Sequence, residues 1–251
     1  MAHAQGYGSN NYCNIEYWSP VGPAQNVYLS CRNPAGALTD SQFVVSFAAG
    51  RMGKARFSYL WANDASAAAK YAPEAAYAYD AVDSAGLSVK RTGTGKYDVY
   101  IPAGGPNLPN PWTVQVTGYA TDARCKLASY SESSRIAQVN CRTPAGAFVD
   151  ARFSLSFASD GSAVGRTDRK YGFYADNEGD ATNTATGQYS VKATGNGGSG
   201  GQLMVTARGG DSTYCVIGGW GANGADMIIT VRCYDPAGAP TNGGFEVALT
   251  L

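Results

Sequence analysis

The sequence contains a single histidine, His3, close to the start of the chain. Catalysis by a Ser-His-Asp or Cys-His arrangement requires a histidine beside the nucleophile. Residues 1–11 are mostly small and polar, and we expect them to form a flexible N-terminal tail that holds no such site. Zinc sites based on histidine are excluded for the same reason. The sequence therefore predicts a protein that is not an enzyme, although a pair of carboxylates acting on glycosidic bonds stays open.

Charge is scarce and balanced. Charged residues make up 15% of the chain, with 19 Lys and Arg against 19 Asp and Glu. A chain without net charge has no field that attracts nucleic acid or an anionic membrane. No apolar run approaches the ~18 residues of a membrane-spanning helix. We therefore expect no nucleic-acid partner and no membrane span.

All six cysteines lie in a segment that occurs three times. Each copy opens with a cysteine, has an aromatic residue five positions later, and continues to a second cysteine and a Pro-Ala-Gly-Ala turn. A phenylalanine stands 12 residues after the second cysteine and begins an alternating strand. The copies run over residues 13–47, 125–157 and 215–249.

The spacing inside each copy predicts its disulfide. Directly opposed residues of an antiparallel hairpin have a constant index sum. Pairing Cys13 with Cys31 places Ile15 opposite Leu29 on the same face, and the other copies behave alike. Each bridge closes a short loop and stabilises by about 3 kcal/mol in a chain-entropy treatment. The predicted disulfides are Cys13–Cys31, Cys125–Cys141 and Cys215–Cys233.

An even number of cysteines in hairpin-compatible pairs indicates an oxidising compartment, so we expect a secreted, extracellular protein. Ala2-His3-Ala4 before Gln5 is similar to the end of a signal-peptide cleavage site, and an arbitrary tail is the alternative.

Alternating segments separated by short turns predict an all-β fold with little helix. We expect a single repeat-built domain over residues 12–251, folded as an antiparallel meander and closed into a β-propeller. Tandem β-sandwiches are the alternative. The cysteine modules span about 12–50, 124–160 and 214–251, and the linking modules about 54–123 and 166–213.

The cysteine hairpin, the Pro-Ala-Gly-Ala turn, a polar residue nine positions after the second cysteine (Asp40, Asp150, Asn242) and the final alternating strand form one pattern. This pattern resembles repeats of uncharacterised secreted bacterial proteins. The resemblance covers most of the chain and implies an extracellular setting. It implies no activity and no functional residue.

The aromatic residue five positions after each first cysteine suggests a binding site. Trp18, Tyr130 and Trp220 lie an odd number of steps from an inward cysteine, so an unbroken strand would point them outward. Three exposed rings, with Trp61 as a fourth candidate, would suit stacking on sugars. The alternative is that each ring covers its own hairpin. The first hypothesis is a lectin-like module that binds carbohydrate or cell-surface glycans.

Two further hypotheses concern metal and self-assembly. Asp176, Glu178 and Asp180 alternate around Gly179 and would accept Ca²⁺, although a solvated acidic turn is the alternative. We expect no other cofactor. Three cysteine modules but two linking modules leave one cysteine module over, which suits subunits that complete one another head to tail. The second functional hypothesis is therefore a structural subunit of an extracellular fibre, coat or matrix.

Overall fold

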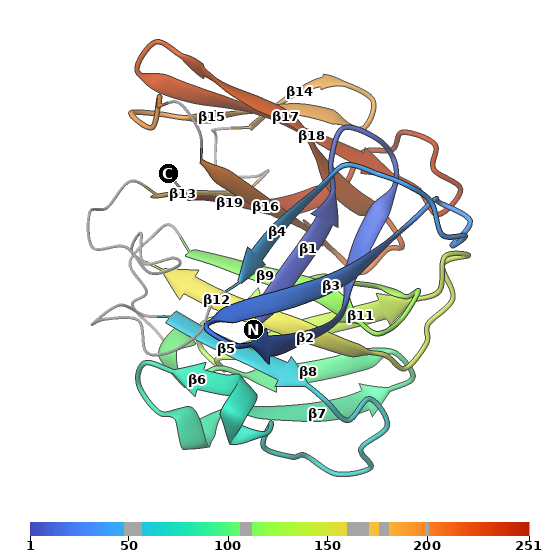
Figure 1. Ribbon diagram of the computed structural model, residues 1–251, viewed down its shortest axis with the longest axis vertical. Helices are drawn as coiled ribbons and strands as arrows, with labels where there is room; N and C mark the ends of the chain where they lie inside the picture. Colours follow the sequence, from blue (N-terminus) through green and yellow to red (C-terminus); the bar gives the residue numbers. More distant parts are fainter. Residues whose placement is uncertain (48–56, 106–111, 160–170, 176–180, 199–200, 251) are drawn as a thin grey trace.

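The structure is a computed structural model that describes residues 1–47, 57–105, 112–159, 171–175, 181–198 and 201–250. These residues form nineteen strands and three 3-10 helices of three residues each (Figure 1). The prediction of an all-β fold is confirmed. Within the described ranges, no helix has the length and apolar character needed to cross a membrane.

The strands group into three units, each around its own apolar core. Unit I contains β1 (Ala2–Gly6), β2 (Tyr12–Val21), β3 (Ala24–Arg32) and β4 (Phe43–Phe47). Unit II contains β5 (Phe57–Ala62), η1 (Ala75–Tyr77), β6 (Ala78–Asp80), η2 (Ser84–Gly86), β7 (Ser88–Gly93), β8 (Lys96–Tyr100), η3 (Pro102–Gly104), β9 (Trp112–Tyr119), β10 (Arg124–Ser131), β11 (Ile136–Arg142) and β12 (Arg152–Ser159). Unit III contains β13 (Tyr171–Ala175), β14 (Ala181–Ala185), β15 (Gln188–Ala193), β16 (Gln202–Arg208), β17 (Tyr214–Asn223), β18 (Asp226–Tyr234) and β19 (Gly244–Thr250).

Units II and III each consist of two facing layers. In unit II the strands β9-β12-β5 face β10-β11-β8-β7, and the core lies between them. In unit III the layers are β16-β19-β13 and β17-β18-β15-β14. Two facing sheets around one core are the arrangement of a β-sandwich. In a meander, strands that are consecutive in sequence lie side by side. Here many neighbouring strands are distant in sequence, so the strand order differs from the expected meander. No propeller blades are found among the described strands.

The three cysteine hairpins have the predicted pairing. β2 pairs with β3, β10 with β11 and β17 with β18, all antiparallel. The registers place Ile15 opposite Leu29, Leu127 opposite Val139 and Ile217 opposite Val231. The disulfides Cys13–Cys31, Cys125–Cys141 and Cys215–Cys233 are confirmed.

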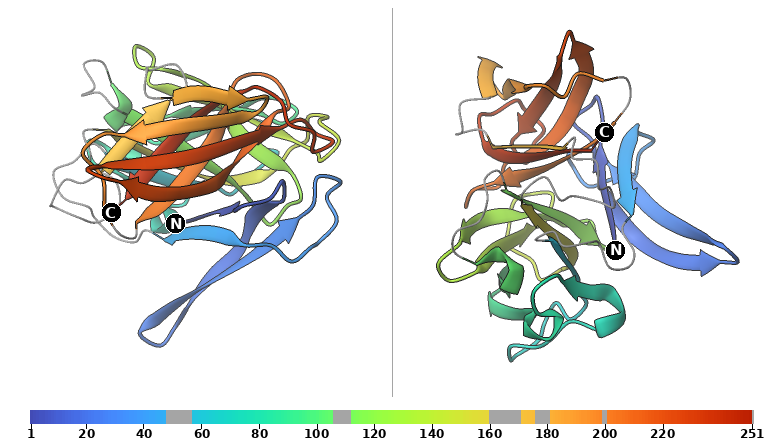
Figure 2. Two further views of the ribbon diagram at one scale, coloured as in Figure 1. Left: turned by 90° about the horizontal axis from the view of Figure 1, so that it is seen from above. Right: turned by 90° about the vertical axis from the view of Figure 1, so that its left-hand side faces the viewer.

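Each linking segment completes the unit that follows it. The segment 57–105 adds β5 to the edge of β12 and the hairpin β7-β8 to the edge of β11. In unit III, β13 pairs with β19 and the hairpin β14-β15 pairs with β18. Unit I has no such addition: among the described strands, β4 pairs with β1 alone, and β3 ends its sheet. The hairpin β2-β3 extends away from the other units (Figure 2).

The Pro-Ala-Gly-Ala turns join the units in a closed ring. Each turn glycine has a positive φ, between 86° and 91°, which favours glycine over any L residue. Each glycine also faces the proline of another unit, so that a Cβ would clash at Gly36 and Gly238 and would make a tight contact at Gly146. The Cβ-to-Cγ separations would be 2.6 Å for Gly36 and Pro144, 3.1 Å for Gly146 and Pro236, and 2.5 Å for Gly238 and Pro34. Backbone conformation and packing together explain why the motif needs glycine.

The expected flexible tail is wrong. Residues Ala2–Gly6 form the buried strand β1, which pairs with β4. Its position matches that of β9 beside β12 and β16 beside β19. His3 is buried, and its ring nitrogens lie 3.0 Å from Thr117 Oγ1 and 3.0 Å from Ser156 Oγ. The small residues of β1 allow it to pack closely between units. In the sequence alone, the same residues are typical of a flexible tail.

Candidate functional site

A repeated bulge determines where the candidate aromatic rings lie. The pairing of each cysteine hairpin shifts by one residue just after the apolar pair that follows the disulfide, Ile15–Leu29 in the first copy. The extra residues are Glu16, Ala128 and Gly218. One inserted residue reverses which face the following side chains occupy. The expectation that the rings point outward is therefore wrong, and all three are partly buried against the cores.

Two of the four candidate rings come together between units I and II. Trp18 of β2 and Trp61 of β5 have ring centroids 6.3 Å apart. Tyr119 lies 5.2 Å from Trp18 and 4.9 Å from Trp61. Tyr77 lies 6.0 Å and 5.4 Å from the same two rings. All four residues are partly exposed, and Trp61 Nε1 is buried without a hydrogen-bond partner among the described residues. We call these four residues the aromatic cluster.

The other two candidate rings lie apart from this cluster. Tyr130 packs on Trp112, with ring centroids 4.8 Å apart, and its hydroxyl donates to the Gly104 oxygen at 2.5 Å. Burial raises the pKa of Tyr130. Trp220 packs edge-on against Tyr7 at 5.4 Å. The structure therefore does not bring the four candidates into one site.

Arg124 lies where the three units meet. The residue before each first cysteine is Tyr12, Arg124 or Tyr214, and the Arg124 guanidinium lies 4.4 Å and 4.0 Å from the centroids of the two tyrosine rings. Burial lowers the pKa of Arg124. Its guanidinium donates to one carbonyl oxygen of each turn: Pro34 at 2.5 Å, Pro144 at 3.4 Å and Pro236 at 3.5 Å. The buried Arg124 guanidinium thus binds the equivalent proline carbonyl oxygen in each of the three units.

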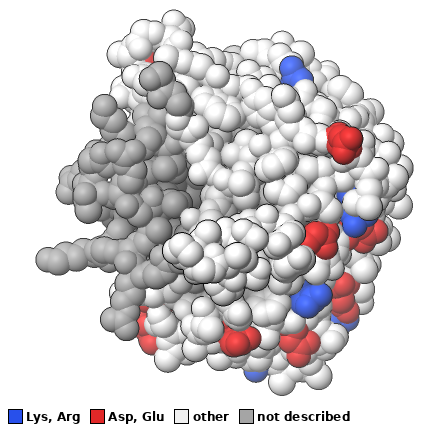
Figure 3. Space-filling model, viewed as in Figure 1, with Lys and Arg blue, Asp and Glu red and all other residues white. Residues whose placement is uncertain are grey.

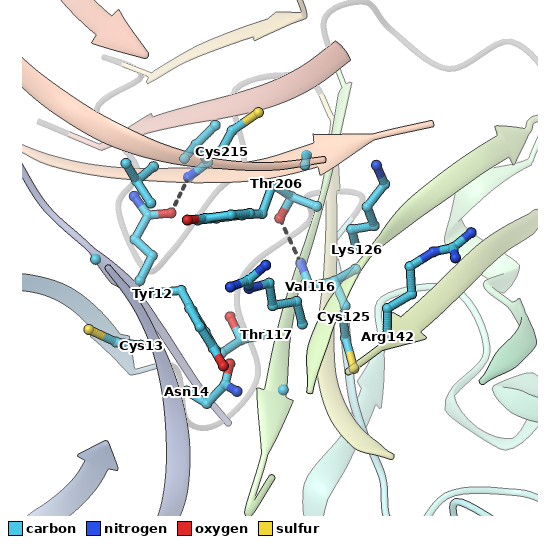
Figure 4. A pocket seen from close by; sticks show the side chains of 18 of the residues that line it. Tyr12, Cys13, Asn14, Val116, Thr117, Cys125, Lys126, Arg142, Thr206 and Cys215 are labelled. Atoms are coloured by element: carbon cyan, nitrogen blue, oxygen red, sulfur yellow. Dashed lines mark hydrogen bonds between the residues drawn. The ribbon is translucent and has the colours of Figure 1, made fainter. Parts of the chain in front are cut away.

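The cavity beside Arg124 is small. Figure 4 shows Tyr12, Lys126 and Arg142 among the residues around it, and the hydrogen bond from the Val116 nitrogen to Thr206 Oγ1. Its volume is about 70 Å³. A cavity of this size holds a few water molecules and excludes a sugar ring. We therefore assign Arg124 and the residues around it a structural role, which is to join the three units.

The face shown in Figure 3 has charges of both signs. On the described part of the face in Figure 3, acidic and basic side chains lie interspersed rather than in a patch of one sign. Asp176, Glu178 and Asp180, the expected Ca²⁺ ligands, fall outside the described residues. Within the described residues, no group of three or more His, Cys, Asp or Glu side chains could hold a metal ion.

The least complete part of the molecule is the outer edge of unit I. Phe43 is 49% exposed and Val45 is 36% exposed. Their counterparts in the other units, Phe153, Leu155, Phe245 and Val247, are all 0% exposed. We call the sides of β3 and β4 that have no neighbouring described strand, with these exposed residues, the open edge; on this side the Gln202 amide donates to the Val45 oxygen. The spacing of the repeat aligns Phe43 with Phe153 in the sequence. The exposure of each ring depends on whether a segment such as 57–105 covers it, and the repeat pattern does not predict this.

The polar residue nine positions after each second cysteine has a role at the corresponding edge of units II and III. Asp150 Oδ1 accepts a hydrogen bond from the Gly95 nitrogen at 2.7 Å, and Asn242 Oδ1 accepts one from the Gly187 nitrogen at 2.8 Å. Hydrogen bonds from Arg91 hold the pKa of Asp150 below its usual range. Asp40 is exposed and has no side-chain partner in the described part of unit I. The repeated sequence pattern includes these residues, but it predicted no role for them.

Comparison with known proteins found no matching family model, no matching curated protein and no matching solved structure. The function is therefore argued from the geometry of this chain.

Proposed function

We propose that the protein is a non-catalytic structural subunit of an extracellular fibre, coat or matrix. The observation that carries this proposal is an unmatched edge: segment 57–105 completes unit II, whereas no described strand covers the matching edge of unit I. Strand addition across a boundary joins two bodies through main-chain hydrogen bonds as well as side chains. Such a joint is suited to assemblies that grow by completing one subunit with part of another.

Three features support a durable extracellular building block. Each cysteine hairpin carries a disulfide, and oxidising compartments preserve such bonds. The turn glycines and Arg124 lock the units into a ring. The balanced, sparse charge leaves little repulsion between neighbouring copies.

Immunogold electron microscopy of the producing cells, combined with fractionation, tests this proposal. We expect the protein in insoluble material outside the cell, released by a reducing denaturant and not by salt. Recovery of the protein as a free monomer in the medium, or inside the cell, would contradict it. As a control, an unrelated secreted enzyme from the same culture is fractionated in the same way, which measures non-specific retention in the insoluble material.

A second candidate is glycan binding at the aromatic cluster. Its four partly exposed rings offer stacking surfaces close to one another. A glycan array with Trp18→Ala tests it, and Trp220→Ala is the matched control because that ring lies outside the cluster. We expect Trp18→Ala alone to weaken binding, by about tenfold. Equal loss in both folded variants, or no binding by the parent chain, would reject a site at the cluster.

A further inference from the structure

We infer that the open edge of unit I binds a linking segment of the 57–101 type, supplied by another polypeptide that carries such a segment unpaired. This inference rests on the proposed role as an assembly subunit. The same kind of segment already fills the matching place in units II and III. The molecule therefore contains two bound examples of the ligand that its first unit lacks.

The hairpin of the bound segment makes a fixed set of contacts. Gly95 approaches so closely that a Cβ there would lie 2.5 Å from the Cys141 oxygen, and its carbonyl accepts from the Cys141 nitrogen at 2.8 Å. Two residues later, the Tyr97 ring packs on Phe153 with centroids 5.2 Å apart, and its hydroxyl accepts from the Ala151 nitrogen at 3.0 Å. Burial raises the pKa of Tyr97 to about 12.

Unit III repeats these contacts with Gly187 and Tyr189. The Cys233 nitrogen donates to the Gly187 oxygen at 2.7 Å, and the Tyr189 ring lies 5.0 Å from the Phe245 ring. The Gly243 nitrogen donates to the Tyr189 hydroxyl at 3.0 Å. A ligand for unit I therefore needs a Gly-x-Tyr hairpin, whose tyrosine would cover Phe43 and bond the nitrogen of Ser41. Ser41 and Phe43 hold the positions of Ala151 and Phe153.

Charge decides which type of segment fits. In unit II, Asp150 forms a bidentate pair with Arg91, with both nitrogen-to-oxygen distances 2.9 Å. In unit III, Asn242 accepts instead from the amide of Asn183 at 3.0 Å. Unit I has Asp40 at this position. A carboxylate matches the guanidinium of an Arg91-type segment better than a neutral amide.

A hollow beside β4 supports the same choice. It is lined by Tyr7, Gln42, Phe43, Val44 and Trp220. In unit II the strand β5 places Trp61 opposite Ser154, where it contacts Tyr119 and Trp18. The counterparts of these neighbours in unit I are Val44, Tyr7 and Trp220, the same residues that line the hollow. The hollow is therefore the place for a tryptophan at the end of the added strand.

A second copy of this chain is a poor occupant. Its segment 57–105 already completes its own unit II, so lending that segment would open one edge for each edge it closes. The number of unpaired edges would stay the same, and no free energy of pairing would be gained. The occupant must bring a linking segment that its own chain leaves unused.

A synthetic peptide with residues 57–101 of this sequence is the probe. We expect saturable binding to the full oxidised chain, measured by fluorescence anisotropy. Trp61→Ala or Arg91→Glu in the peptide should each weaken binding by about tenfold. Asp40→Lys in the chain should weaken the parent peptide and restore the Arg91→Glu peptide, which a general loss of folding cannot do. Lys90→Glu in the peptide is the matched control and should bind like the parent, because Lys90 is exposed in the bound example.

A photoreactive residue in place of Tyr97 identifies the site. Crosslinks should fall on residues 41–45 of the chain. Crosslinks confined to residues 151–155 would mean that the peptide exchanges with the resident segment, and the inference would be overturned. Absence of binding, or a dimer of the chain that excludes the peptide, would also overturn it. The peptide can bind whether or not the protein is found in extracellular material, so this inference and the proposed function fail in distinguishable ways.

Discussion

Units I and II contain the same cysteine hairpin, the same turn and the same following strand, yet one core is closed and the other is open. Phe153 is fully buried beneath Tyr97, whereas Phe43 is 49% exposed. The difference lies in the added segment, not in the repeated one. The comparison teaches that the cysteine module is half of a sandwich, and that its partner half comes from elsewhere in sequence.

The largest expected contrast is between the two phenylalanines. Phe153→Ala should lower the free energy of unfolding by about 3–5 kcal/mol, because it empties a fully enclosed position. Phe43→Ala should cost less than about 1 kcal/mol in the isolated chain, since half of its ring already faces water. Denaturant titration followed by tryptophan fluorescence measures both. Equal losses would show that unit I is closed in solution.

Replacing one disulfide by a pair of serines sharpens the comparison further. Loss of Cys13–Cys31 or of Cys125–Cys141 should each cost about 3 kcal/mol, since the bridges close similar spans of 18 and 16 residues. The location of the loss should differ. β11 stays paired with β8, whereas β2 is the one neighbour of β3 among the described strands. Hydrogen exchange should therefore rise along β3 in the first variant and little along β11 in the second; the reverse order would contradict the open edge.

The limits of prediction follow from the same contrast. Index sums within a hairpin predicted the disulfides and the pairing of Ile15 with Leu29, because both depend on contacts close in sequence. The bulge at Glu16 could not be predicted from the sequence, because the inserted residue is of a different type in each copy. This one residue turned Trp18 from the expected exposed platform into a ring packed between units.

Strand β1 shows a second limit. Its small residues are typical of a tail, and only its position reveals its role. Gly6 stands seven residues before Cys13, as Gly118 stands seven before Cys125, a spacing that could have predicted the strand. Pairing between segments such as β8 and β11 could not be predicted, because it depends on long-range contacts that alternation alone does not specify.

Acid should lower the stability of the folded chain through His3, which contacts Thr117 and Ser156 of unit II. Burial, and then the nearby amino-terminal ammonium, lower the pKa of His3 to about 3. Below about pH 6.5 the His3 side chain binds a proton in the unfolded state but not in the folded state. The free energy of unfolding therefore falls as the pH drops from 6.5 towards 3, by about 1.4 kcal/mol per pH unit. At pH 5 the loss is about 2 kcal/mol. His3→Asn should flatten the dependence of denaturation midpoint on pH; an unchanged slope would place the effect in other groups.

The smallest expected difference is between Asp150 and Asp40, and it tests the open edge most directly. Asp150→Ala removes the acceptor for the Gly95 nitrogen and for Arg91, so it should cost about 1–2 kcal/mol. Asp40→Ala removes an exposed carboxylate without a described partner and should change stability by less than about 0.5 kcal/mol. Thermal denaturation of both variants, alone and with the 57–101 peptide, measures the pair. If the peptide fills the open edge, it should raise the midpoint of the parent chain more than that of Asp40→Ala, because Asp40 then does for unit I what Asp150 does for unit II.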